Sequence, residues 1–214
     1  MKRLGRYTLL FEHRPAILGH AAVCGKKEAA GPLARDFDQT FLDSYLNQES
    51  WEKAESMLQT EAANLAIRKA GLQKQDINMV FAGDLLNQCI SSTFGLRGMD
   101  IPFLGQYGAC STMAQTLIMA SIMVECGAAN YACAVTAERQ FRTPLEYGSQ
   151  RAPTAQWTAT ASGSAVLGMS GDIQVRHATV GRIVDLGVTD MTNMGAAMAP
   201  AAAQTLLDFF NDTA

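Results

Sequence analysis

The central part of the chain alternates between helical patterns and short apolar runs, and this alternation restricts the fold more than any other feature. A helix pattern follows Ser50 and ends at Gly71, and residues 77–83 form an almost continuous apolar run. Further segments of both kinds follow at residues 91–98, 101–105, 111–125 and 131–136. Apolar strands separated by helices are typical of a mostly parallel sheet covered by helices. The sequence therefore predicts an α/β fold in one domain.

The two ends of the chain supply the remaining expected elements. Residues 7–11 and 17–24 have the pattern of short strands, and residues 199–210 have the pattern of a final helix. Residues 161–169 and 173–181 are expected to form consecutive antiparallel strands. Residues 26–46 and the Gly/Pro/Gln-rich residues 145–157 are expected to be loops.

Composition excludes several classes of function. Hydrophobic residues make up 48% of the 214 residues and charged residues 17%, which argues against disorder. The net charge of −3 leaves no basic field, so nucleic acid is not an expected partner. No apolar run approaches the roughly 20 residues needed to cross a bilayer, and the N-terminus does not resemble a signal peptide. We therefore expect synthesis and residence on the cytoplasmic side.

The cysteine pattern argues against disulfides and structural zinc. The five cysteines are an odd number without CxxC spacing. A reducing compartment fits this pattern best.

Cys110 is the strongest candidate for a reactive residue. It lies in Gly108-Ala109-Cys110-Ser111, between an expected strand and an expected helix. The unpaired N–H groups and the positive dipole at a helix start favour a thiolate, and small neighbours allow a tight, exposed turn. The alternative is a buried cysteine that packs as a small hydrophobic residue. The histidines at positions 13, 20 and 177 are better explained as structural or surface residues, so a Cys–His–Asn site cannot be assembled.

Two further segments follow expected strands at the edge where open α/β sheets bind ligands. Asp84 could accept hydrogen bonds from a substrate or hold a cation, and it could equally cap a helix or order a loop. Glu138 and Arg139 follow the strand at residues 131–136, where a surface ion-pair loop is the more frequent explanation.

These features, in this order, resemble the thiolase superfamily and, within it, the stage V sporulation protein AD family of spore-forming bacteria. The resemblance extends over nearly the whole chain. The strings that carry it include Gly83-Asp84-Leu85-Leu86-Asn87-Gln88, Gly108-Ala109-Cys110-Ser111-Thr112, Thr136-Ala137-Glu138-Arg139-Gln140-Phe141, and Asp185-Leu186-Gly187-Val188-Thr189-Asp190.

The resemblance implies a fold of two similar halves, each with a mixed five-stranded sheet and helices on both faces. Residues 1–214 would form the thiolase-like N-terminal domain, with residues from about 183 beginning the link to the second half. In the condensing enzymes of the thiolase superfamily, the catalytic histidines come from that second half, whereas the resemblance to the sporulation family implies a non-catalytic use of the pocket. A single half would leave the apolar face of residues 111–125 uncovered, including Leu117, Ile118 and Met119, so we expect an oligomer, a homodimer in the simplest case.

The resemblance also implies a function. The family binds pyridine-2,6-dicarboxylate (dipicolinic acid) and, with membrane proteins of the stage V sporulation A operon, aids its uptake into the developing spore. Peripheral association with the spore inner membrane is therefore expected. The ligand-binding residues would be Asp84, Cys110 and Ser111. No resident metal or cofactor is expected, although calcium could accompany dipicolinate as its counter-ion and relieve repulsion with Asp84.

Two alternatives to a binding module stay open. The chain could be a thiolase- or ketoacyl-synthase-like acyltransferase with Cys110 as its nucleophile, or a purely structural partner of membrane proteins. The catalytic alternative needs a base, which the sequence does not supply. The family also has an insertion before Thr136-Ala137-Glu138 that this chain lacks.

Overall fold

The computed structural model describes residues 1–43, 45–85, 88–138, 159–190 and 193–214. Their contacts divide the chain into two compact units. We call Pro15–Gln174 the sheet unit, and Met1–Arg14 together with Val175–Ala214 the terminal unit. The boundary expected near residue 183 stays a prediction.

The sheet unit alternates strands and helices, as the sequence predicts. Its strands and α-helices are β3 (Ala16–Cys24), β4 (Gln39–Thr40), α1 (Trp51–Lys69), β5 (Met79–Asp84), α2 (Ile90–Leu96), β6 (Phe103–Gly105), α3 (Thr112–Glu125), β7 (Ala132–Glu138), β8 (Ala161–Gly168) and β9 (Ile173–Gln174). Short 3₁₀ turns are η1 (Glu28–Ala30), η2 (Ala34–Asp36), η3 (Lys74–Asp76), η4 (Arg97–Met99) and η5 (Ala109–Ser111).

Five strands form a mixed sheet in the order β3-β8-β7-β5-β6. β5 pairs in parallel with β6 and β7, whereas β8 is antiparallel to both β7 and β3. The two-residue strands β4 and β9 extend the sheet beside β3. The predicted five-stranded mixed sheet is therefore confirmed, with two short edge additions.

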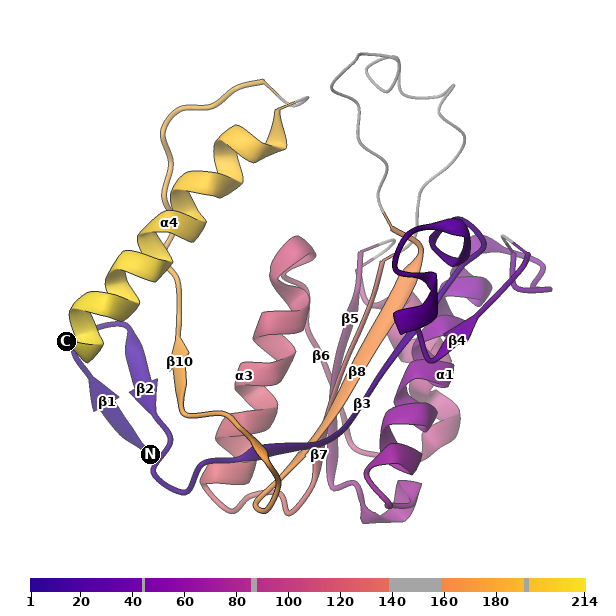
Figure 1. The fold of residues 1–214 in the computed structure, drawn as a ribbon, viewed down its shortest axis with the longest axis horizontal. Coiled ribbons are helices and arrows are strands. Elements are labelled where there is room, and N and C mark those ends of the chain that lie inside the picture. The colour runs from indigo at the N-terminus through magenta and orange to yellow at the C-terminus, as the bar shows by residue number, and fades with distance from the viewer. Residues whose placement is uncertain (44, 86–87, 139–158, 191–192) are drawn as a thin grey trace. The chain divides into compact units, whose positions relative to one another are not determined.

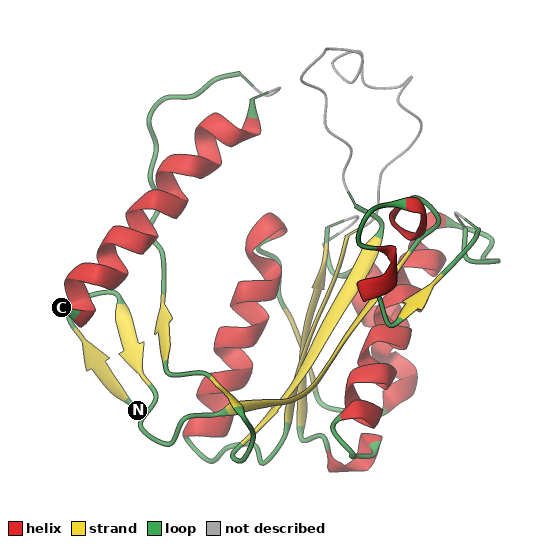
Figure 2. Ribbon diagram, viewed as in Figure 1, coloured by secondary structure: helices red, strands yellow, loops and turns green. Residues whose placement is uncertain are grey.

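Helices cover both faces of this sheet: α1 and α3 lie on opposite sides (Figure 1, Figure 2). Alternate strand residues explain the two layers, because neighbouring side chains on a strand point to opposite faces. Val80, Ala82 and Val135 pack with Ala63 and Ile67 of α1 in one buried core. The residues between them, such as Phe81 and Ala134, are also buried, which accounts for the almost continuous apolar runs in the sequence.

The ends of α1 follow from local chemistry. Ser50 has extended backbone angles, and its side-chain oxygen accepts a hydrogen bond from the Lys53 N–H at 3.2 Å. At the other end Gly71 adopts φ = +71°, a left-handed conformation that favours glycine. Both predicted helix signals are confirmed.

β7 is longer than the sequence predicts and includes the junction at residues 135–137. Val135, Thr136 and Ala137 pair in unbroken register with β5 on one side and β8 on the other. Residues 135–137 therefore belong to a regular strand that ends at Glu138.

The predicted pairing of residues 161–169 with residues 173–181 is wrong. β9 pairs with β3, on the side away from β8, and β10 (His177–Thr179) pairs with β2 (Thr8–Leu10). Because β8 and β9 are both antiparallel to β3, they run in the same direction. The alternating pattern correctly indicated strands, but it carries no information about which strand lies between them.

The terminal unit contains a three-stranded antiparallel sheet in the order β1 (Lys2–Leu4), β2, β10, and the helix α4 (Met194–Thr213). α4 begins earlier than predicted, because Asn193 caps it by accepting a hydrogen bond from the Ala196 N–H and Pro200 lies inside the helix. In the part of the chain that the structure describes, no helix is long and apolar enough to span a membrane. The Asp212 carboxylate fixes the β1–β2 turn by accepting from the Tyr7 N–H at 2.8 Å.

The distribution of exposed apolar residues differs from the expectation for α3. Leu117, Ile118 and Met119 are half-buried. Large exposed apolar side chains occur instead on α4, at Met198, Leu206, Leu207 and Phe210. The expected oligomer stays a prediction.

Candidate functional site

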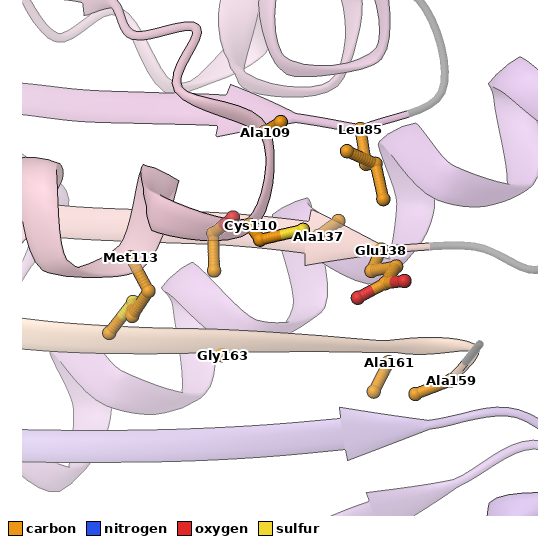
Figure 3. Close-up of a pocket in the computed structure, with 10 residues that line it drawn as sticks. Leu85, Ala109, Cys110, Met113, Ala137, Glu138, Ala159, Ala161 and Gly163 are labelled. Atoms are coloured by element: carbon orange, nitrogen blue, oxygen red, sulfur yellow. The ribbon is translucent and has the colours of Figure 1, made fainter. Parts of the chain in front are cut away.

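A cavity of about 250 Å³ opens on the α3 face of the sheet unit, at the end of the sheet where β5 and β7 terminate (Figure 3). Its walls come from the ends of β5 and β7, the start of β8, the turn that leads into α3, and the first turn of α3. Its described lining consists of Leu85, Ala109, Cys110, Met113, Thr136, Ala137, Glu138, Ala159, Ala161 and Gly163. We call this the Cys110 pocket.

Cys110 lies in η5, the 3₁₀ turn that precedes α3, and its side chain is exposed. The residue before it, Ala109, has φ = +46°. For a residue with a Cβ atom this left-handed conformation costs of order 1–3 kcal/mol, and such strain is concentrated at functional sites. The predicted tight, exposed turn is therefore present, and the alternative of a buried, packing cysteine does not hold for Cys110.

Neighbouring residues hold this turn in place. Buried Thr112 donates a hydrogen bond from its hydroxyl to the Ala109 carbonyl at 2.8 Å and accepts one from the Gly108 N–H at 3.3 Å. Gly83 lets β5 lie close to Gln106 and Thr112. A Cβ atom added at Gly83 would lie only 2.0 Å from the Gln106 carbonyl oxygen and 2.6 Å from the Thr112 side chain. Only glycine fits there, which explains the glycine that precedes Asp84 at the end of β5.

Ser111 is exposed beside the pocket but does not belong to its described lining. The sequence predicted that α3 begins at Ser111, whereas the α-helix begins at Thr112 and the 3₁₀ turn precedes it. The Ser111 hydroxyl and N–H both donate to the Gly108 carbonyl, at 2.8 and 3.0 Å. A ligand role for Ser111 stays a prediction, and it would require the hydroxyl to leave this intraturn bond.

Asp84 lies at the end of β5 but faces the opposite side of the sheet. Its carboxylate accepts hydrogen bonds from the Cys89 N–H at 3.2 Å, the Ser92 N–H at 2.8 Å and the Ser92 hydroxyl. Gln59 of α1 donates to the same Ser92 oxygen at 3.1 Å. Asp84 is therefore a buried residue that caps the start of α2, as one of the two interpretations of the sequence expected. Its predicted contact with a ligand is untested, and the structure does not bring it together with Cys110.

Glu138 is a pocket residue that sequence reasoning assigned to a surface loop. It ends β7 on the same face as Thr136, and Figure 3 shows its carboxylate in the cavity on the side toward which the Cys110 side chain points. Partial burial raises the pKa of this carboxyl above its ordinary value. The period-two alternation of β7, extended to Glu138, could have placed it on the face of Cys110.

The other chemically active residues lie elsewhere. His13 and His20 are exposed, and His177 packs edge-on against Phe209 in the terminal unit, so none of the three lines the pocket. Burial raises the pKa of the Cys24 thiol, and likewise that of Cys133, to about 11. Leu86, Arg139 and Phe141, which the sequence analysis also names, lie outside the described residues.

The described residues contain no group of three or more His, Cys, Asp or Glu side chains arranged to hold a metal ion.

Comparison with solved structures defines the class of fold. The chain superimposes on OleA from Xanthomonas campestris with a TM-score of 0.65 at 15% identity, covering 94% of this chain and 72% of that one. It is similarly related to 3-oxoacyl-(acyl carrier protein) synthase III from Xanthomonas oryzae pv. oryzae, with a TM-score of 0.63 at 16% identity and coverage of 93% and 73%. The fold is thus thiolase-like.

Comparison of sequences identifies the family within that class. The model of the stage V sporulation protein AD family matches residues 5–214. The chain is 46% identical to stage V sporulation protein AD of Bacillus subtilis (strain 168) over 219 residues, covering 99% of this chain. The chain belongs to the stage V sporulation protein AD family. It spans 65% of the length of that relative.

Proposed function

We propose that this chain binds dipicolinic acid in the Cys110 pocket and takes part in its uptake into the developing spore. The observation that carries the proposal is the pocket itself: a small cavity built around an exposed cysteine on a strained turn, in a member of a sporulation family. Binding, without covalent chemistry, is the simplest use of such a cavity.

The dimensions and lining of the pocket suit a flat diacid. A cavity of roughly 150 Å³ is enough to admit benzene, so about 250 Å³ can hold one aromatic ring with two carboxylates. Leu85 and Met113 offer apolar surface for the ring faces, while Cys110, Thr136 and Glu138 offer polar atoms. A mostly apolar cavity with a few polar groups is the usual form of a small-molecule site.

The uptake role extends beyond the pocket. We propose that the protein acts at the inner membrane of the spore as a peripheral partner of the membrane proteins of its operon, with calcium arriving as the counter-ion of its cargo. The association of two copies is part of the same proposal, and the exposed apolar residues of α4 support an association surface in the terminal unit.

Acyl transfer is the second candidate, and the exposed, strained position of Cys110 favours it. In that reaction the Cys110 sulfur would attack a thioester carbonyl, forming an acyl-enzyme and releasing the thiol of the donor. The attack requires that the cysteine proton be accepted by a base. We rank binding first because the chain matches the stage V sporulation protein AD family, whereas its likeness to 3-oxoacyl synthases is a likeness of fold alone.

A thermal-shift experiment on the full-length protein separates the two candidates. Dipicolinate, with and without calcium, is compared with acetyl-coenzyme A. We expect dipicolinate at a hundredfold excess over its Kd to raise the Tm by a few degrees, because a ligand that binds only the native state stabilises it. Acetyl-coenzyme A should produce no shift and no thioester hydrolysis.

Failure to bind dipicolinate, together with thioester turnover that Cys110→Ala abolishes, would reverse the ranking and assign the acyltransferase activity.

A further inference from the structure

We propose that Glu138 binds one carboxylate of a dicarboxylate ligand as a neutral acid, so that occupation of the Cys110 pocket takes up one proton. This inference rests on the proposed function and adds a specificity-determining residue to it. The placement of Glu138 in the cavity with Cys110 is the observation that carries it.

The strand register determines which side chains share the cavity with Glu138. Glu138 is opposite Ala161 of β8, and Thr136 is opposite Gly163, so β8 contributes only small uncharged residues beside it. Asp84 of β5 is opposite Ala137, and its carboxylate accepts from Ser92 of α2 on the other side of the sheet.

The charges around Glu138 can be named for each element that packs there. From η5 and α3 the pocket receives Cys110 and Met113, and from the end of β5 it receives Leu85. Among the described residues of the lining, Cys110 and Glu138 are the titratable groups, and neither lysine nor arginine is present. Among these residues, an anionic ligand would therefore meet the Glu138 carboxyl group without a neighbouring lysine or arginine.

Two carboxylates cannot approach closely unless they share a proton or a cation. Partial burial already raises the pKa of Glu138, and an incoming dianion acts in the same direction. The balanced step is the addition of one solvent proton to the Glu138 carboxylate as the ligand enters. The resulting O–H then donates a hydrogen bond to the ligand carboxylate, and such a charge-assisted bond is stronger than a neutral one.

Calorimetry of the full-length protein measures this proton directly. Dipicolinate is titrated at pH 6.0 to 7.5, below the ordinary thiol pKa of about 8.5, in two buffers of different ionisation enthalpy. We expect the wild type to take up between zero and one proton per ligand, rising toward one as pH rises. Its affinity should fall accordingly, by at most about tenfold per pH unit.

Glu138→Gln supplies a neutral side chain whose amide can donate to the ligand at every pH. We expect this variant to bind with an affinity that does not change with pH and with no proton uptake. Glu138→Ala should bind about tenfold to a hundredfold more weakly at pH 6.0, because it loses a hydrogen bond to a charged group. Glu52→Gln, an exposed change on α1, should keep the wild-type proton uptake.

Isophthalate, which lacks the ring nitrogen, separates this inference from the proposed function. Proton uptake with isophthalate but no binding of dipicolinate would retain Glu138 and reject dipicolinic acid as the ligand. Dipicolinate binding to the wild type without proton uptake would overturn the role of Glu138. Dipicolinate binding that requires calcium in the wild type and is abolished in Glu138→Gln would overturn it as well. Failure to bind either diacid would overturn both, and these wild-type results do not depend on any variant folding.

Discussion

Asp84 and Glu138 are the last residues of the neighbouring parallel strands β5 and β7. Asp84 pairs with Ala137, the residue just before Glu138, yet the two carboxyl groups lie on opposite faces of the sheet. Asp84 is fully engaged by backbone and hydroxyl donors at the start of α2. Glu138 faces the Cys110 pocket, where partial burial raises its pKa.

The comparison shows that lying at the ligand-binding edge of a sheet is not enough to make a residue part of a site. The face of the strand decides, because alternate residues point to opposite helix layers. The Asp84 carboxylate stabilises the fold. The Glu138 carboxyl is partly buried, which disfavours its charged form, and such perturbed groups are common in functional pockets.

Replacing Asp84 should have the largest effect on stability. Asp84→Ala leaves the buried N–H of Ser92 and its neighbours without their acceptor and breaks the network that reaches Gln59. We expect the free energy of unfolding to fall by roughly 2–4 kcal/mol, measured by urea denaturation.

Glu138→Ala is the matched control for Asp84→Ala, and it should change the same free energy by no more than about 0.5 kcal/mol. Equal losses in the two variants would contradict the distinction between the two carboxylates.

Filling the Cys110 pocket should have the largest effect on binding. Cys110→Leu places a bulkier side chain in the cavity, and we expect the affinity for dipicolinate to fall by at least about tenfold, or 1.4 kcal/mol. Cys110→Ala should retain affinity within roughly threefold, because a thiol is a weak hydrogen-bonding group. Calorimetry gives both values.

Cys126→Leu is the control for Cys110→Leu, since Cys126 is also exposed but lies at the far end of α3. If it weakened binding as much as Cys110→Leu, the ligand would not occupy the Cys110 pocket.

A smaller effect is expected on the pH dependence of stability. The pKa of Glu138 is raised in the native state because burial disfavours its charged form. Its stabilising contribution is therefore complete below the ordinary glutamate pKa and is lost as the pH rises through the native pKa. Glu138→Gln should thus match or exceed the wild type in stability at pH 7 and lose this advantage near pH 4, as measured by urea denaturation at each pH. An advantage that grows toward low pH would have the wrong sign.

Much of the fold could be predicted from the sequence because its signals are local. Ser50 and Gly71 bound α1 through capping and a left-handed turn, and both act within a few residues. The partners of β9 and β10 could not be predicted, since alternation marks a strand without saying which neighbour it joins. The start of α4 was obscured by Pro200, which is typical of a first helical turn but here lies inside the helix.

The site was predicted less completely for the same reason. Cys110 was found because small residues around a cysteine between a strand and a helix indicate an exposed turn. Glu138 was missed because β7 was expected to end at residue 136, which removed the alternation that places it in the pocket. The separation of Asp84 from Cys110 depends on sheet faces and α2, which lie beyond local sequence patterns.

The most direct test of the central claim is whether dipicolinate protects Cys110 from alkylation. Iodoacetamide labelling of the full-length protein, followed by mass spectrometry, reports the rate at each cysteine. Exposed Cys110 and Cys126 should label rapidly, whereas buried Cys133, with its pKa raised to about 11, should label slowly. Saturating dipicolinate should slow the labelling of Cys110 at least about tenfold and leave Cys126 unchanged. An unchanged rate at Cys110, under conditions where calorimetry shows dipicolinate bound, would contradict the account.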